Sequence, residues 1–354
     1  MDSKNLYYLM GLNALNFTVQ QIEVLRSQFR GNLEEAWEYL SQKETWQDQN
    51  LKWVDRELEV VLKKKIDLVS FWDERYPKAL KEIFQAPPLL YVRGRMPSAP
   101  LALAVVGSRK ASAYGLEVTQ GLCAELTHHS VLIVSGMALG IDAQAHRSTL
   151  QAGGMTIGVL GNGFHYVYPK EHQKLYDEVA EKGALVTEFS YDRLPLAHHF
   201  PRRNRILAGL TQGVVVVEAL RKSGALITAR FALENNRDVF CIPGRLDSAL
   251  SQGPHQLIQQ GAKLISCAQD ILDEFHIRLE HSFLTQVPKI VQSLSMEQKE
   301  LLDHLDHPKD FETLLSELHL PVDALSKLLV IAEMDGIIGH SAGQYFRRLS
   351  WQLH

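Results

Sequence analysis

The sequence predicts an α/β protein with a doubly wound, mostly parallel sheet. Apolar runs without polar alternation recur along the chain, as in strands buried on both faces, and amphipathic stretches separate them at strand–helix–strand spacing. The expected strands are 101–107, 131–136, 156–161, 184–189, 213–219, 238–244 and 262–265. The expected helices are 114–129, 141–152, 170–182, 203–209, 223–235 and 253–260.

Shorter segments on either side predict two further domains. Apolar residues at three-to-four spacing, as in 50–64, predict helices before the sheet. After it, three helical patterns precede two short strands around residues 341–343, the order expected of a winged-helix-like domain. The expected domains are helical (1–65), doubly wound (66–270), linker (271–295) and winged-helix-like (296–354), the last with helices near 296–305, 310–317 and 321–335.

Composition sets limits on the class of protein. The formal net charge is −4, and no apolar stretch reaches 18 residues, so we expect neither a membrane span nor a membrane partner. Three widely spaced cysteines suit the cytoplasm rather than a disulfide framework. The histidine pairs 128–129 and 198–199 lack the spacing of metal ligands, so we expect no metal and no cofactor.

Glycine-containing turns follow several expected strands. Right-handed crossovers place all strand-to-helix loops on one edge of a parallel sheet, where helix amino termini favour anions. The residues expected to hold an anion there are Gly107, Ser108, Arg109, Ser135, Gly136, Lys222, Ser223 and Gly224.

Positive charge gathers at the same edge. Residues 193–230 contain seven Lys or Arg and one acid, and Arg202, Arg203 and Arg205 follow Phe200-Pro201. We expect these three arginines to fan along phosphates, because a guanidinium fits phosphate oxygens. Phe200 would offer a flat surface for a base. The alternatives are arginines that solvate a helix face and a phenylalanine that fills the core.

The phosphate compound is expected to be a polyanion. No G-x-G-x-x-G or Walker sequence is present, and five basic side chains exceed what a small ligand needs. Asp142, Glu188 and Glu218 form no nucleophile–base set, so we expect no catalytic residues and no enzyme. Residues 289–354 hold six Lys or Arg and ten Asp or Glu, which disfavours DNA binding by the tail.

Several motifs resemble those of the DNA processing protein A family, also called DprA or Smf. They are "VVGSRKASAYG", "VSGMALGIDAQAH", "TIGVLGNG…YP", "HHFPRRNRILAG", "VVVVEA…KSGALITARFALE", "VFCIPG" and "GPHQLIQQGAKLI". With the similar upstream segment "FWDERYPKALKEIFQAPPLLYVRG", the match runs in order over about residues 66–270. The resemblance implies an extended Rossmann fold that binds single-stranded DNA. It also implies a role in natural transformation, in which the protein protects incoming strands, helps to load the RecA recombinase and forms homodimers through about residues 225–265.

The family's DNA pocket carries over to thirteen positions of this sequence. They are Gly107, Ser108, Arg109, Ser135, Gly136, Phe200, Arg202, Arg203, Asn204, Arg205, Lys222, Ser223 and Gly224. Three features depart from the family pattern: Leu139 replaces a basic residue, Ala225 replaces a serine, and "GLNALNF" at 11–17 replaces a helix-hairpin-helix signature. The alternative functions are a nucleotide phosphoribohydrolase-type enzyme, whose Pro-Gly-Gly-x-Gly-Thr turn is absent, and a protein-interaction scaffold.

Overall fold

The computed structural model describes residues 3–42, 51–276, 295–305, 307–335, 337–341 and 343–347. The chain divides into two compact units, Met1–Ile271 and Leu272–His354. Most of the linker expected over 271–295 lies outside the described residues. Within the described ranges, every helix is too short or too polar to span a bilayer.

The first unit contains a nine-stranded sheet of order β1-β2-β6-β5-β4-β3-β7-β8-β9. Neighbouring strands from β6 through to β9 pair in parallel, whereas β2 pairs antiparallel with both β1 and β6. The predicted doubly wound, mostly parallel fold class is thereby confirmed, and β1 and β2 extend it beyond the expected strands. The strands are β1 (Asp67–Ser70), β2 (Leu89–Gly94), β3 (Ala102–Val106), β4 (Leu132–Ser135), β5 (Thr156–Val159), β6 (Ala184–Thr187), β7 (Gly213–Val216), β8 (Asp238–Cys241) and β9 (Lys263–Leu264).

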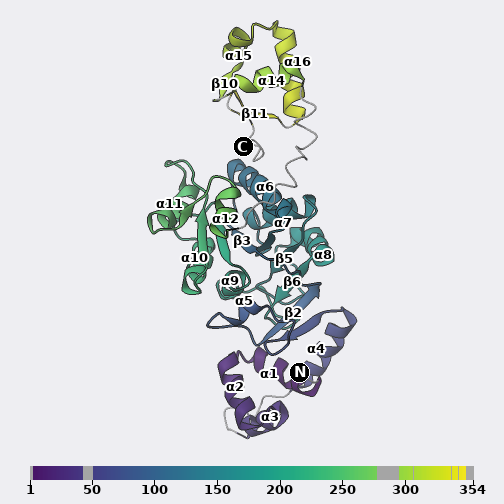
Figure 1. Cartoon of the computed structure of the whole chain (residues 1–354). Coiled ribbons are helices and arrows are strands. Elements are labelled where there is room, and N and C mark those ends of the chain that lie inside the picture. Colours follow the sequence, from purple (N-terminus) through teal and green to yellow (C-terminus); the bar gives the residue numbers. More distant parts are fainter. Residues whose placement is uncertain are drawn as a thin grey trace. The chain divides into compact units, whose positions relative to one another are not determined.

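Helices cover both faces of this sheet (Figure 1). Helix α7 packs against α6 and α8 on one face, and α9 packs against α10 and α5 on the other. A separate apolar core lies under each group, with Leu175 and Val179 in one core and Ile206 and Ala229 in the other. The helices are α5 (Lys78–Lys81), α6 (Ala113–His128), α7 (Ile141–Gln151), α8 (Gln173–Lys182), α9 (His199–Gly209), α10 (Gly224–Glu234), α11 (Gln252–Gln259) and α12 (Gln269–Glu274), with 3-10 turns η2 (Lys170–His172) and η3 (Ala249–Ser251).

The four helices that the structure describes before β1 belong to the same compact unit. They are α1 (Ser3–Ala14), α2 (Val19–Gln28), α3 (Leu33–Ser41) and α4 (Lys52–Lys63), gathered beside β2 in Figure 1. Thr18 begins α2 with a capping box, and Asn32 caps α3. Their buried face, which includes Leu9 and Val54, shares a core with Leu89 of β2. The helices are therefore fixed to the sheet through its antiparallel edge.

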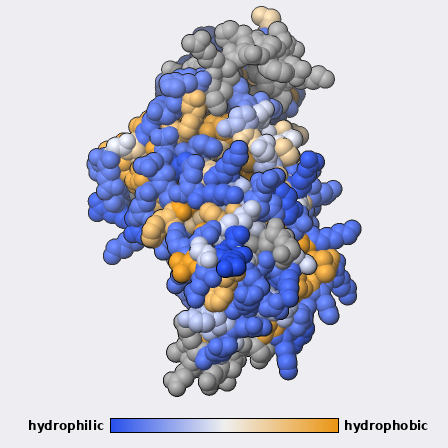
Figure 2. Space-filling view, turned by 60° about the horizontal axis from the view of Figure 1, so that its bottom comes forward, coloured by the Kyte–Doolittle hydropathy of each residue, from blue (hydrophilic) through white to orange (hydrophobic). Residues whose placement is uncertain are grey.

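Figure 2 views the molecule with the end that carries these helices brought forward. The surface seen there is mostly hydrophilic, with apolar residues exposed in separate patches. Large apolar side chains exposed in the first unit include Val24, Leu62 and Phe84. Isolated exposed apolar residues are normal for a folded protein and need no partner to explain them.

The second unit has its own small core, which includes Leu301, Leu325 and Ile338. Its sheet has the order β10-β12-β11, and both pairings are antiparallel. Three helices and the strands β11 and β12 lie near their expected positions, whereas β10 is not among the expected strands. The winged-helix classification stays a prediction, and residues 348–354 lie outside the described ranges. The elements are α14 (Met296–Asp303), β10 (Lys309–Asp310), α15 (Phe311–Leu318), α16 (Val322–Met334), β11 (Ile338–Ser341) and β12 (Gln344–Arg347).

Candidate functional site

The strand order reverses between β3 and β7, which is where open α/β sheets place a ligand. In this chain the carboxylate of Glu218 fills that position. It accepts hydrogen bonds from the backbone N–H of Ser112 at 2.9 Å and from its hydroxyl at 2.5 Å. A Cβ on Gly115, in the first turn of α6, would lie 2.3 Å from Oε2 of Glu218. The anion expected at the amino terminus of α6 is therefore the protein's own carboxylate.

Side chains of helix α9 contact the carboxyl ends of β4 and β5 and the residue after β6. The helix begins at His199, four residues before the expected start, and Pro201 lies in its first turn, where proline is tolerated. Successive residues of a helix point about 100° apart. Arg203 therefore projects away from Arg202, whereas Arg202 and Arg205 share one side of the helix.

Arg203 is buried and bound to main-chain oxygens. Its Nη1 donates to the carbonyl oxygen of Gly136 at 2.8 Å and to that of Val159, and its Nε donates to Asn204 Oδ1 at 3.1 Å. Burial lowers the pKa of Arg203 to about 10, although the charge of Asp142 opposes this shift. The side chain thus ties the ends of β4 and β5 to α9.

Arg205 and Arg202 both bind Glu188, which follows β6. Arg205 holds both carboxylate oxygens, at 2.6 Å and 2.8 Å, and Arg202 Nη2 donates to Oε2 at 2.8 Å. Burial raises the pKa of Glu188, but the charges and hydrogen bonds of Arg205 and Arg202 outweigh burial, so the pKa is lowered. Arg202 also donates to Asn16, and Asn13 donates to the Glu188 carbonyl oxygen at 2.9 Å. The N-terminal helices therefore reach this cluster directly.

These contacts correct the expected fan of three arginines. The side chain of Arg202 is 36% exposed, whereas that of Arg205 is 8% exposed and Arg203 is 4% exposed as a residue. Because their donors are already engaged inside the protein, Arg203 and Arg205 would have to break buried bonds before they could contact a phosphate. Arg202 is the most exposed of the three, and contacts of these arginines with phosphates stay a prediction.

An exposed cation and two aromatic rings lie close together at the start of α9. The guanidinium carbon of Arg109, after β3, is 5.4 Å from the ring centre of Phe200. The ring of Phe200 packs over Gly161, which follows β5. A Cβ at position 161 would lie 2.8 Å from that ring, so glycine allows this close contact. The ring of Tyr168 lies 5.3 Å from that of Phe200 and is tilted by 39°. Arg109, Phe200 and Tyr168 form what we call the arginine–aromatic cluster.

Tyr168 is not among the residues expected from the sequence. It is 40% exposed, which leaves part of its surface open to a ligand. The available signal is the Tyr-Pro pair in the "GNG…YP" motif, which by itself assigns no role to the tyrosine. Because Tyr168 comes from the loop after β5 and Phe200 from α9, only the folded chain brings the two rings together.

The other expected site residues divide between surface and interior. Lys222 and Gly224 are exposed, and Ser223 caps α10 by accepting from Ala225 N–H. Asn204 is buried and donates to the Gly224 carbonyl oxygen at 3.1 Å, which joins α9 to the start of α10.

Ser135, at the end of β4, and Ser108, after β3, also differ in how far they are buried. Ser135 is fully buried, and its hydroxyl donates to the Val105 carbonyl oxygen at 2.7 Å. Gly107 and Ser108 are half-buried, and Ser108 accepts from Lys110 N–H at 3.1 Å. Gly136 is buried, and its carbonyl oxygen accepts from Arg203.

The two departures from the family pattern lie in different surroundings. Leu139 is 43% exposed, so a basic residue there would face solvent, whereas Ala225 is buried. Of the histidine pairs, His199 is buried against Phe189 and leaves no surface for a ligand. No cluster of three or more His, Cys, Asp or Glu within the described residues could hold a metal ion.

Comparison with known proteins identifies the family. The sequence profile of DNA recombination-mediator protein A matches residues 67–276. The chain belongs to this family. It is 39% identical to protein Smf of Escherichia coli over 290 residues, which cover 79% of this chain and 77% of that protein. It is 46% identical to DNA processing protein DprA of Streptococcus pneumoniae over 211 residues, or 58% of this chain and 73% of that protein.

Solved structures of family members share the fold. The DprA structure from Streptococcus pneumoniae superposes with a TM-score of 0.67 and 36% identity, covering 77% of this chain and 99% of that chain. DNA processing protein A from Helicobacter pylori, described for its single-stranded DNA binding mode, gives a TM-score of 0.54 and 29% identity, covering 60% of this chain and 96% of that chain.

Proposed function

We propose that this family member binds single-stranded DNA at the carboxyl edge of its parallel sheet. The observation that carries the proposal is the arginine–aromatic cluster, which offers a cation for phosphate beside two rings for bases. Backbone charge and base stacking together are the usual means of holding a single strand with little sequence preference. The single-stranded DNA named for the Helicobacter pylori relative supports the same ligand.

The roles of the site residues follow from their exposure. Arg109, Arg202 and Lys222 contact phosphates, and Phe200 stacks with a base. Gly107, Ser108, Gly136, Ser223 and Gly224 shape the turns around the strand. Arg203, Asn204, Arg205 and Ser135 hold that frame in place from within. This division assigns direct contacts to the accessible side chains and positioning to the buried ones.

We further propose a non-enzymatic role in natural transformation and recombination. The protein would protect incoming strands and help to load RecA, as its family membership suggests. The protein would also form a homodimer through about residues 225–265, as its family membership suggests. No observation favours the phosphoribohydrolase alternative, and turnover of nucleoside monophosphates by the purified protein would revive it.

Fluorescence anisotropy with labelled oligothymidylate at several salt concentrations tests the binding proposal. Affinity should fall steeply with salt. Arg109→Ala and Arg202→Ala each remove one cation that faces a phosphate, so each should reduce the log–log slope by about 0.7. Arg93→Ala is the matched control, since Arg93 pairs with Leu185 near the start of β6, at the opposite edge of the sheet. Equal affinities of parent and Arg109→Ala at moderate salt would contradict the proposal.

A further inference from the structure

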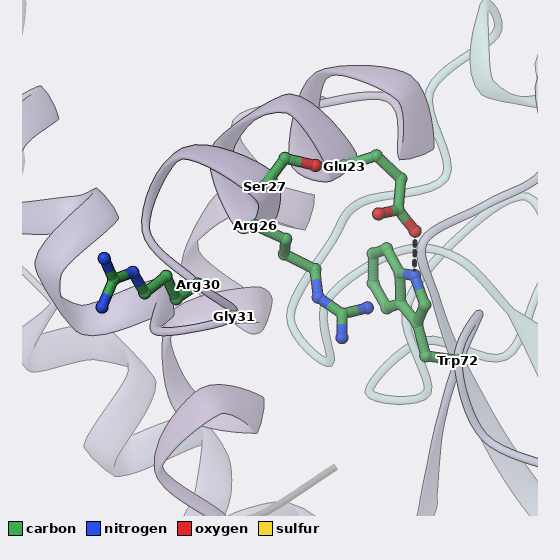
Figure 3. A pocket seen from close by; sticks show the side chains of 6 residues that line it. All are labelled: Glu23, Arg26, Ser27, Arg30, Gly31 and Trp72. Atoms are coloured by element: carbon green, nitrogen blue, oxygen red, sulfur yellow. Dashed lines mark hydrogen bonds between the residues drawn. The ribbon is translucent and has the colours of Figure 1, made fainter.

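A second candidate site lies on the N-terminal helices, away from the residues considered so far. An open pocket of about 440 Å³ is lined by α2, the turn after it, and the loop after β1 (Figure 3). The lining residues are Glu23, Arg26, Ser27, Arg30, Gly31 and Trp72. Two arginines, one tryptophan and one hydroxyl thus surround a space of the size that small ligands occupy.

Arg26 and Trp72 lie next to each other in the lining of this pocket. The guanidinium carbon of Arg26 lies 4.4 Å from the centre of the indole, alongside it in Figure 3. Nη1 of Arg26 is buried and has no hydrogen-bond acceptor among the described residues. A buried donor of this kind is uncommon and calls for an acceptor. A guanidinium is planar, and a nucleobase can stack on it as on an aromatic ring.

The carboxylate of Glu23 is already engaged, because it accepts the indole N–H of Trp72. Arg30 is exposed, and none of the described carboxylates pairs with it. Figure 3 shows its guanidinium extending away from Trp72 and from the other lining side chains. Arg30 and the exposed Ser27 are therefore the lining residues left to bind an anion.

The pocket is connected to the strand ends through the start of α2. Asn16, just before α2, contacts Arg202. Arg26 follows Val19, the first residue of α2, by seven positions, which is about 10 Å along a helix. A residue that contacts Arg202 and most of the pocket's lining residues therefore lie on one short segment of the chain, residues 16–31.

We propose that this pocket binds one nucleotide unit, with its phosphate held by Arg30 and Ser27 and its base stacked on the Arg26–Trp72 pair. The nucleotide is either part of the bound single strand or a free nucleotide. In the first case, which rests on the proposed function, the N-terminal helices lengthen the DNA site beyond the sheet domain. This assigns binding to a region where the sequence carries no helix-hairpin-helix signature.

The test compares Arg30→Gln and Arg26→Gln with Arg56→Gln, a matched control at an exposed arginine of α4 in the same set of helices. Oligothymidylates of about 4 and about 16 nucleotides span the usual site sizes of single-strand-binding folds. Arg26→Gln should weaken binding of the longer one about fivefold or more, the low end of a base stack's contribution. Arg30→Gln should reduce its salt slope by about 0.7. The shorter oligonucleotide and the Arg56→Gln control should be unaffected.

A second measurement distinguishes the two sources of the nucleotide. Thymidine monophosphate is titrated while tryptophan fluorescence is followed in the parent, Arg30→Gln and Trp72→Phe. Quenching that is abolished in both variants supports a free nucleotide as occupant. If the monophosphate causes no such quenching and both arginine variants bind the longer oligonucleotide as the parent does, the inference is overturned.

Failure of the proposed function gives a different result, namely a parent that binds neither oligonucleotide. In that case the monophosphate titration alone decides whether the pocket takes a nucleotide. Arg30→Glu provides a second variant, since charge reversal at this exposed position should weaken binding more than Arg30→Gln does. Unchanged urea unfolding midpoints in the arginine variants show that the losses of binding are not losses of folding.

Discussion

Arg205 holds both oxygens of the Glu188 carboxylate, at 2.6 Å and 2.8 Å, and the side chains of the two residues are only 8% and 1% exposed. Removing one member of such a pair leaves a buried charge without its partner, which costs far more than the pair itself contributes. The most conspicuous basic motif in the sequence, "RRNR", therefore serves in part to neutralise an acid from the preceding strand end.

Arg205→Ala should destabilise the protein by about 3–5 kcal/mol, because Glu188 would be left without its bidentate partner. Urea unfolding measures this loss, and the double variant Glu188→Gln with Arg205→Met should recover much of it. Arg245→Ala removes an exposed arginine from an exposed pair with Asp247 and should leave the unfolding midpoint unchanged. A variant at Arg205 that keeps the parent's stability but no longer binds DNA would instead make Arg205 a direct phosphate ligand.

The Glu188 pair also predicts how stability depends on pH. Since its folded-state pKa is lowered, Glu188 contributes stability that is present above the ordinary glutamate value of about 4.3 and is lost as the pH falls through the lower folded pKa. The difference in unfolding free energy between the parent and Glu188→Gln should therefore narrow as the pH falls below about 4.3. Urea midpoints measured across that range provide the check, and a constant or widening difference would contradict the assignment.

The parallel strands could be predicted because strands buried on both faces appear as unbroken apolar runs. The two antiparallel strands could not, because β1 begins with an exposed aspartate and is buried only at its end, and β2 follows Pro87-Pro88, which indicates only an extended connection. The sequence likewise contains no sign that these arginines would be bound by partners inside the protein. Arg203 finds its acceptor on Gly136, 67 positions away, and Arg202 meets Asn16, 186 positions away. A charge pattern along the chain cannot tell which charges are neutralised by partners that only folding supplies.

Tyr168→Ala should weaken single-stranded DNA binding by about 1 kcal/mol or more if its ring stacks with a base beside Phe200. Because no charge is removed, the salt slope should stay the same, which separates this effect from that of Arg109→Ala. Tyr168→Phe should bind as the parent does, and Phe84→Ala serves as a control at an aromatic residue that is 81% exposed. Anisotropy titrations at two salt concentrations measure both quantities. If Tyr168→Ala bound with the affinity of the parent, the prediction would be contradicted, and Phe200 would be the only ring of the cluster that stacks with a base.

Glu218 gives the last prediction, because its carboxylate occupies the position where an external phosphate would meet the amino terminus of α6. Glu218→Ala should free the Ser112 N–H and create an anion site there, worth about 0.3–1 kcal/mol from the helix dipole. Thermal unfolding with added inorganic phosphate should then show a larger rise in Tm for the variant than for the parent. Glu82→Ala, which removes a carboxylate that is 67% exposed, should respond as the parent does. An equal rise in Tm for Glu218→Ala and the parent would contradict this prediction. It would mean that the Glu218 carboxylate does not take the place of an external phosphate between β3 and β7.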